Sequence, residues 1–215
     1  MSKYSTLTEK IYTELCDDIA CHRFESGQIL TLNMLRERFD TSHTPVREAL
    51  NRLISDGLVE YTANKGIRVR VYSEKEIKEM FEFAAELEVT AVRICSYSFS
   101  MAPLKADLRA LIEEERVALE NDDYDAWFAA ADVFHTNFYK YADNNFLKEA
   151  SDKVGANINT LSSYYSSHDT FRDIFKRQEQ ICIAIEDNNY DLAADLIRAH
   201  FQFSLYNTLK GYFIK

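Results

Sequence analysis

Hydrophobic residues recur at helical spacing along the first part of the chain. Four of them repeat every four residues and predict one apolar face of a helix over about residues 5–22: Leu7, Ile11, Leu15 and Ile19. A second, shorter helix is predicted where three apolar residues keep a spacing of three and four: Leu32, Leu35 and Phe39. The polar residues 40–42 end this helix.

A third helix is predicted directly afterwards. Thr44 can cap it, and Pro45 suits its first turn because a missing N–H costs nothing there. Gly57 favours a left-handed end of the helix, and four residues form its apolar face: Val46, Leu50, Leu53 and Ile54. Two short helices joined by about four residues, the second with polar and basic residues at its start, predict a helix-turn-helix.

Two alternating runs of apolar and polar residues come next, at 58–62 and 67–71. Residues 63–66, Ala-Asn-Lys-Gly, join them, and the glycine permits the positive φ of a hairpin turn. Residues 1–72 are therefore predicted to form a winged helix-turn-helix.

From residue 73 onward, helical spacing is interrupted mainly by short polar segments. Ser73 and Glu76 have the spacing of a capping box, and Pro103 marks a break. Residues 73–215 are predicted to form an antiparallel bundle of about six helices, over 73–100, 104–120, 123–142, 146–165, 169–187 and 190–213. The acidic run 113–115 is interpreted as a solvated helix face.

Composition supports a mainly α fold. The 215 residues include only 5 glycines and 2 prolines, which leaves little material for the turns of an all-β protein. The formal net charge of −10 would by itself argue against a polyanionic partner. However, residues 1–72 hold ten basic and ten acidic side chains, whereas the other 143 hold 15 basic and 25 acidic ones. The N-terminal domain is therefore the candidate for contact with an anion.

The four cysteines show no CxxC spacing, and the first residues lack the basic-then-apolar pattern of a signal peptide. No stretch approaches the roughly 18 uninterrupted apolar residues of a membrane span. We therefore expect a soluble cytoplasmic protein with no membrane partner.

The predicted third helix carries a family motif. Residues 42–59 read Ser-His-Thr-Pro-Val-Arg-Glu-Ala-Leu-Asn-Arg-Leu-Ile-Ser-Asp-Gly-Leu-Val. This run resembles the recognition-helix signature of the GntR superfamily of bacterial transcription regulators, S-R-x-P-V-R-E-A-L-x-x-L-x-x-x-G-L-V. One fixed position differs, because His43 stands where an arginine is usual.

The resemblance implies that the third helix reads the major groove of double-stranded DNA and that the hairpin tip lies at the minor groove. Arg47 matches the motif arginine, and a bidentate arginine on guanine contributes about 1–3 kcal/mol of discrimination. Arg52, Arg68 and Arg70 could equally contact phosphates or serve solubility. The candidate DNA contacts are Asn33, His43, Thr44, Arg47, Arg52, Asn64, Lys65 and Gly66.

Residues 73–215 resemble the FCD effector domain, the FadR C-terminal domain, in its VanR-like branch. The matching segments are 123–128, 134–135, 142–147, 178–185 and 193–200. The resemblance implies a domain that binds an effector and forms a homodimer.

Many FCD domains hold a divalent metal through one aspartate and three histidines in the bundle centre. Those four places fall on Ala131, His135, Gln178 and His200, so two of the four ligands are present. Asp132 could replace the missing aspartate only by rotating about 100° around the helix. A zinc or nickel type of ion on His135 and His200 is one possibility, and no cofactor is firmly implied.

The alternative is a polar pocket inside an aromatic wall, which suits a small organic molecule, with His135, Gln178, His200 and Asp132 as its polar residues. The resemblance implies an acid-like metabolite. Ala84 stands where an arginine is common in the family, so the usual anion clamp is missing and a less acidic ligand is expected. Each histidine could also be a core residue with backbone partners.

Three functions follow from these residues. The first is a ligand-responsive DNA-binding regulator, commonly a repressor, that binds a pseudo-palindromic operator as a homodimer because two half-sites need two reading heads. The second is a constitutive DNA-binding dimer with a degenerate effector site. The third is a metal-dependent helical-bundle enzyme, which the absence of an E-x-x-H pair, a G-x-S-x-G elbow and a P-loop disfavours.

Overall fold

The computed structural model describes residues 6–20, 23–63, 65–99, 101–165 and 168–213. It divides into two compact units, Met1–Ser73 and Glu74–Lys215. This boundary lies one residue from the predicted one.

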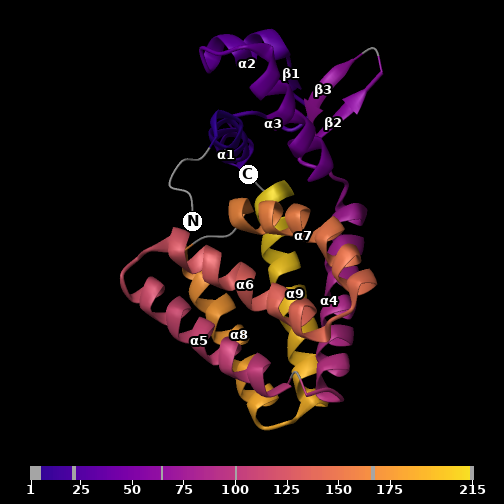
Figure 1. Ribbon diagram of the computed structural model, residues 1–215, viewed down its shortest axis with the longest axis vertical. Helices are drawn as coiled ribbons and strands as arrows, with labels where there is room; N and C mark the ends of the chain where they lie inside the picture. Colours follow the sequence, from indigo (N-terminus) through magenta and orange to yellow (C-terminus); the bar gives the residue numbers. More distant parts are fainter. Residues whose placement is uncertain (1–5, 21–22, 64, 100, 166–167, 214–215) are drawn as a thin grey trace. The chain divides into compact units, whose positions relative to one another are not determined.

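The N-terminal unit combines three helices with a small sheet (Figure 1). The helices are α1 (Leu7–Ala20), α2 (Leu32–Arg38) and α3 (His43–Ser55). The strands β1 (Ile29–Leu30), β2 (Val59–Thr62) and β3 (Gly66–Val69) form an antiparallel sheet in the order β1-β3-β2. In the hairpin, Val59 pairs with Val69 and Thr62 pairs with Gly66. This is the predicted winged helix-turn-helix.

The core of this unit forms from the apolar faces of its helices. Six of the predicted apolar positions are fully buried: Ile11 and Leu15 from α1, Leu35 from α2, and Val46, Leu50 and Leu53 from α3. Each such side chain contributes about 1.5–3 kcal/mol on leaving water. Because α3 packs against both α1 and α2, its opposite face is presented outward.

One local prediction for this unit is wrong, and one strand was not predicted. Ser42 rather than Thr44 occupies the N-cap of α3, because the helix begins at His43. Strand β1 was not expected, since two residues are too few to show alternation, and it forms only because Ile29 and Leu30 pair with β3.

The C-terminal unit contains six described helices (Figure 1). They are α4 (Glu74–Ser96), α5 (Met101–Glu120), α6 (Tyr124–Ala142), α7 (Asn145–Tyr165), α8 (His168–Glu186) and α9 (Tyr190–Phe213). Helix α9 packs against α4, α7 and α8, while α5 packs against α6 and α8. The mainly α fold with a helical C-terminal bundle is confirmed.

The turns between these helices follow the polar segments. Asp122, Asp143 and Asn188 adopt positive φ values of 53°, 48° and 58°, which aspartate and asparagine tolerate better than most residues. Pro103 was expected at a break, but it lies in the first turn of α5, where no N–H is required. The helix therefore starts at Met101 rather than at residue 104.

Two further observations concern membrane-spanning helices and cysteines among the described residues. No helix in the described ranges is long and apolar enough to cross a membrane. Among the described residues, Cys16, Cys95 and Cys182 form no disulfide bond.

Candidate nucleic-acid interface and candidate ligand pocket

One face of helix α3 is buried in the core of its unit, and the opposite face is exposed to solvent. Val46, Leu50 and Leu53 fix the buried side, and this leaves His43, Thr44 and Arg47 exposed near the N-terminal end. Within the described parts of the chain, no hydrogen bond or ion pair engages the Arg47 side chain. Its guanidinium is therefore available for an external phosphate or base edge.

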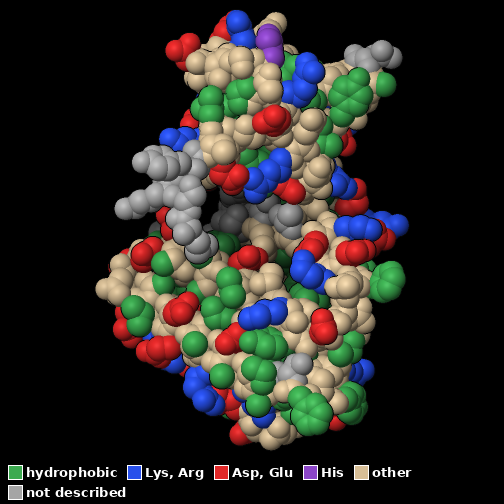
Figure 2. Space-filling model, in the orientation of Figure 1, with side chains coloured by type: hydrophobic (Ala, Val, Ile, Leu, Met, Phe, Trp, Pro, Cys, Tyr) green, Lys and Arg blue, Asp and Glu red, His purple; other side chains and the backbone are tan. Residues whose placement is uncertain are grey.

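The other candidate DNA contacts lie on α2 and on the hairpin. Asn33 is exposed in the first turn of α2, where Thr31 caps the helix by accepting a 3.2 Å hydrogen bond from the Met34 backbone N–H. Figure 2 shows a histidine and basic side chains close together at the α2 end of the unit. Lys65 is exposed in the hairpin turn, and Gly66 has a φ of +82° with no atom near the position of a Cβ. Asn64 lies outside the described residues.

Arg52 is engaged inside its own unit. Its Nη1 lies 2.7 Å from Oε2 of Glu9, and its guanidinium stands 3.7 Å from the centroid of the Tyr12 ring. The Tyr12 hydroxyl in turn donates a 2.7 Å hydrogen bond to Asp56. This cluster ties the C-terminal half of α3 to α1.

The C-terminal unit contains a cavity of about 400 Å³. Residues from five helices, α4 and α6 to α9, line it, and much of its wall is aromatic. The aromatic residues on the wall are Phe81, Trp127, Phe128, Tyr139 and Phe201. A cavity of this size suits a small organic molecule.

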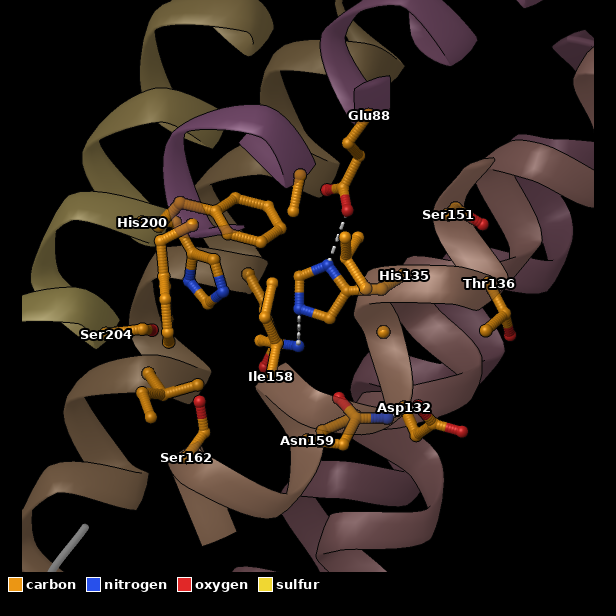
Figure 3. Close-up of a pocket in the computed structure, with 18 of the residues that line it drawn as sticks. Glu88, Asp132, His135, Thr136, Ser151, Ile158, Asn159, Ser162, His200 and Ser204 are labelled. Atoms are coloured by element: carbon orange, nitrogen blue, oxygen red, sulfur yellow. Dashed lines mark hydrogen bonds and ion pairs between the residues drawn. The ribbon is translucent and has the colours of Figure 1, made fainter. Parts of the chain in front are cut away.

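A chain of polar side chains crosses this cavity (Figure 3). His135 Nδ1 lies 2.7 Å from Oε2 of Glu88, and His135 Nε2 lies 3.4 Å from Nε2 of Gln178. The rings of His135 and His200 have centroids 5.0 Å apart. Helices α4, α6, α8 and α9 each supply one of the four residues. The structure thus places His135, Gln178 and His200 together.

Asp132 does not join this chain. Its carboxylate accepts a hydrogen bond from the Asn159 side chain on α7, and the residue is exposed at the cavity rim. Figure 3 shows Asp132 beside Asn159 and turned away from the His135 ring. The inward rotation that a ligand role requires is absent.

Burial and neighbouring charge act differently on the two histidines. Burial lowers the pKa of His135, but the Glu88 carboxylate outweighs this effect and raises the pKa above its ordinary value. Burial, followed by the charge of His135, holds the pKa of His200 well below its usual range. His200 is therefore a neutral imidazole that can donate at one nitrogen and accept at the other.

Sequence reasoning missed two buried glutamates, of which Glu88 lines the cavity. Glu88 is fully buried, and it continues the apolar face of α4 that includes Phe81 and Ala84. Glu115 was interpreted as solvated, but it is fully buried on the apolar face of α5. Burial raises the pKa of Glu115 to about 8. The missed signal was an acidic residue at a position where helical spacing requires an apolar one.

Comparison with known proteins assigns both units. Residues 7–69 match the family model described as bacterial regulatory proteins, gntR family, and residues 79–203 match that of the FCD domain. The chain belongs to the GntR family. Its helical unit is an FCD domain. Members of this family are DNA-binding transcription regulators, not enzymes.

Similar proteins include named repressors. This GntR-family chain is 26% identical over 196 residues to the probable D-xylose utilization operon transcriptional repressor of Paenarthrobacter nicotinovorans, covering 91% of this chain and 86% of that protein. It is 30% identical over 148 residues to the gluconate operon transcriptional repressor of Bacillus subtilis, covering 69% and 60%. A GntR regulator from Rhodococcus sp. RHA1 has the same fold, with a TM-score of 0.73 at 22% identity and coverage of 95% and 98%.

The residues of this FCD domain do not fit the metal set of the family. Ala131 and Gln178 occupy two of the four ligand places, and Asp132 is held at the rim by Asn159. In the described ranges, no group of three or more histidine, cysteine, aspartate or glutamate side chains is placed to hold a metal ion. Since an open metal site requires about three protein ligands, His135 and His200 alone do not form one.

The expected acid-like ligand also lacks a counter-charge in this FCD domain. Ala84, at the place of the usual arginine, lines the cavity, and no lysine or arginine occurs among its described lining residues. The acidic residues of the lining are Glu88, Asp132 and Asp152. The electrostatic character of the wall is therefore acidic.

Proposed function

We propose that this GntR-family chain is a ligand-responsive transcriptional repressor that acts in the bacterial cytoplasm on a pseudo-palindromic operator. The observation that carries the proposal is the exposed, unpaired guanidinium of Arg47 near the N-terminal end of α3. That end of a recognition helix is the part that meets base edges in the major groove. The repressor role is supported by the similarity to the D-xylose and gluconate operon repressors.

The proposed contact set follows the exposed surface of the N-terminal unit. Arg47, His43 and Thr44 face the major groove, while Lys65 and Gly66 approach the backbone or minor groove through the hairpin. Asn33 supports the set from α2. We leave Arg52 out of this set because Glu9 and Tyr12 already engage it.

The proposed assembly is a homodimer. One α3 helix reads one half-site, so a pseudo-palindromic operator requires two copies on the same face of the duplex. The C-terminal unit is the proposed site of both dimerisation and effector binding. Light scattering after gel filtration is expected to give twice the chain mass of 25.0 kDa.

The proposed signal is a small molecule in the cavity of the C-terminal unit. The volume of the cavity and the polar chain of Glu88, His135 and Gln178 support this role. Ligand binding can shift operator affinity only by the difference in ligand affinity between the two conformations of the protein. A constitutive regulator would show the same operator affinity with and without every effector.

The DNA-binding proposal is tested by fluorescence anisotropy on fragments from upstream of the gene of this protein. Arg47→Ala is expected to weaken the binding free energy for the fragment that the wild type binds most tightly by about 1–3 kcal/mol. Lys10→Ala on α1 is the matched control, because it removes one exposed positive charge from the same unit. The proposal fails if no fragment binds at low salt, or if the two variants lose the same affinity.

A further inference from the structure

The polar wall of the cavity presents acceptors that lack donors. Oε1 of Glu88 and Oε1 of Gln178 are buried and have no hydrogen-bond partner among the described residues. Both residues are fully buried, and both line the cavity. A buried acceptor without a donor costs about 1–3 kcal/mol, so the wall is incomplete until something donates to it.

The contact with His135 does not satisfy Glu88. His135 Nδ1 reaches only Oε2, at 2.7 Å, and this leaves Oε1 open in either protonation state of the ring. Whether His135 is a neutral ring with its proton on Nδ1 or an imidazolium, its Nδ1–H donates to Oε2 of Glu88 and does not reach Oε1. The free oxygen can therefore accept a hydrogen bond from an N–H or O–H group in the cavity.

The charge of the lining favours one type of donor. The described lining contains three carboxylates and no lysine or arginine. Asp152 is paired with Lys148 at 2.6 Å, whereas Glu88 pairs with the His135 imidazole and with no lysine or arginine among the described residues. A ligand carboxylate placed here would face a like charge, whereas an ammonium group would offset a buried one.

The remaining wall suits the body of an organic cation. Trp127, Phe128 and Phe201 provide aromatic surface, on which a cation is attracted to the ring faces and an alkyl or aryl group is buried. The Nδ1 atom of the neutral His200 ring is a further cavity-lining group without a hydrogen-bond partner among the described residues.

We propose that the cavity binds a small organic amine in its ammonium form, with an N–H directed at Oε1 of Glu88 and an apolar body against the aromatic wall. This inference rests on the proposed function, since it names the chemical class of the effector. The resemblance to the family implies a metal ion and an acid-like ligand. The site proposed here instead uses the Glu88 carboxylate, without a metal ion, to bind a cationic ligand.

The test compares probes of one shape and different charge by isothermal titration calorimetry without DNA. The probes are benzylamine, benzyl alcohol and benzoate, together with hexylamine, hexanol and hexanoate. In at least one series the amine is expected to bind about tenfold or more tightly than the alcohol, with the acid weakest, because a charged hydrogen bond is stronger than a neutral one. The inference is overturned if the acid or alcohol binds as well as the amine, or if neither amine binds at about 10 mM.

A matched pair of variants assigns the effect to Glu88. Glu88→Gln keeps the shape and removes the charge, and it is expected to remove the preference for the amine over the alcohol. Glu82→Gln makes the same change at an exposed position of the same helix and is expected to leave the preference intact. An unchanged preference in Glu88→Gln, in a sample with wild-type circular dichroism, overturns the inference.

Failure of this inference is distinguishable from failure of the proposed function. If the wild-type protein binds operator DNA but no amine, the inference is wrong and the DNA-binding proposal stands. If it binds the amine but no upstream fragment, the inference stands and the proposed function is wrong.

Discussion

The Nδ1 atom of His135 lies 2.7 Å from Oε2 of Glu88, and this contact joins α6 to α4 inside the helical unit. The Glu88 side chain is 1% exposed, whereas that of His135 is 24% exposed. In this pair, a buried carboxylate contacts an imidazole that is partly accessible to solvent. Removing the imidazole would leave the carboxylate without its only described donor.

We predict that His135→Leu destabilises the protein by about 2–4 kcal/mol at neutral pH, because it leaves a buried carboxylate unpaired. Glu88→Gln in the His135→Leu background is expected to recover part of this loss. Urea denaturation of the wild type, both single variants and the double variant gives the coupling energy. Strictly additive losses would show that the two side chains do not stabilise each other.

Glu115 gives a prediction about pH. Burial raises its pKa to about 8 from 4.5, with His135 opposing the shift, so the folded state binds the proton more tightly than the unfolded state. The stabilising contribution of the protonated form is complete below about pH 4.5 and is lost as the pH rises through about 8. Glu115→Gln removes this loss. At about 1.4 kcal/mol per pKa unit, the variant should gain at most about 4 kcal/mol over the wild type between pH 5 and pH 8.

Urea denaturation at several pH values measures this difference. Glu114→Gln is the control, because Glu114 is the exposed neighbour on the same helix. The assignment is contradicted if the free-energy difference between Glu115→Gln and the wild type is the same across this pH range.

The sequence predicted the helices well because apolar spacing reports which face of each helix is buried. The faces of α1 and α3 are examples, since Leu15 and Leu50 are both fully buried where the spacing placed them. Strand β1 could not be predicted, because its two residues form a strand only by pairing with β3. Tertiary pairing, not local preference, creates that element.

The pocket was only partly predictable. The spacing and the family motif selected His135 and His200, but the conformation of Asp132 depends on Asn159, which lies on a different helix. Glu88 and Glu115 were overlooked because an acidic residue is usually solvated. Helical spacing contained the contrary information, since both residues fall on apolar faces.

We predict that metal binding can be restored by two substitutions. Ala131→Asp with Gln178→His rebuilds the family ligand set beside His135 and His200, and zinc or nickel should then raise the melting temperature. At a free metal concentration of 100 times the dissociation constant, metal binding would stabilise the folded state by about 2.7 kcal/mol. The wild type is expected to show no shift with either ion and none with a chelator. Thermal denaturation of the wild type and the single variants provides the comparison, and a zinc-dependent shift in the wild type would refute the prediction.

Substitutions of Arg52 and Arg47 are expected to have different effects, the first mainly on stability and the second mainly on DNA affinity. Arg52 contacts Glu9 and the Tyr12 ring, so Arg52→Ala is expected to lower the free energy of unfolding by about 1 kcal/mol and to leave the operator affinity of the folded protein nearly unchanged. Arg47→Ala should do the opposite, because its side chain makes no hydrogen bond or ion pair with the described residues. Denaturation curves and operator titrations at several salt concentrations measure both quantities. If Arg52→Ala reduced the salt dependence of binding by about one ion, as loss of a phosphate contact does, then Arg52 would exchange Glu9 for DNA and would belong to the interface.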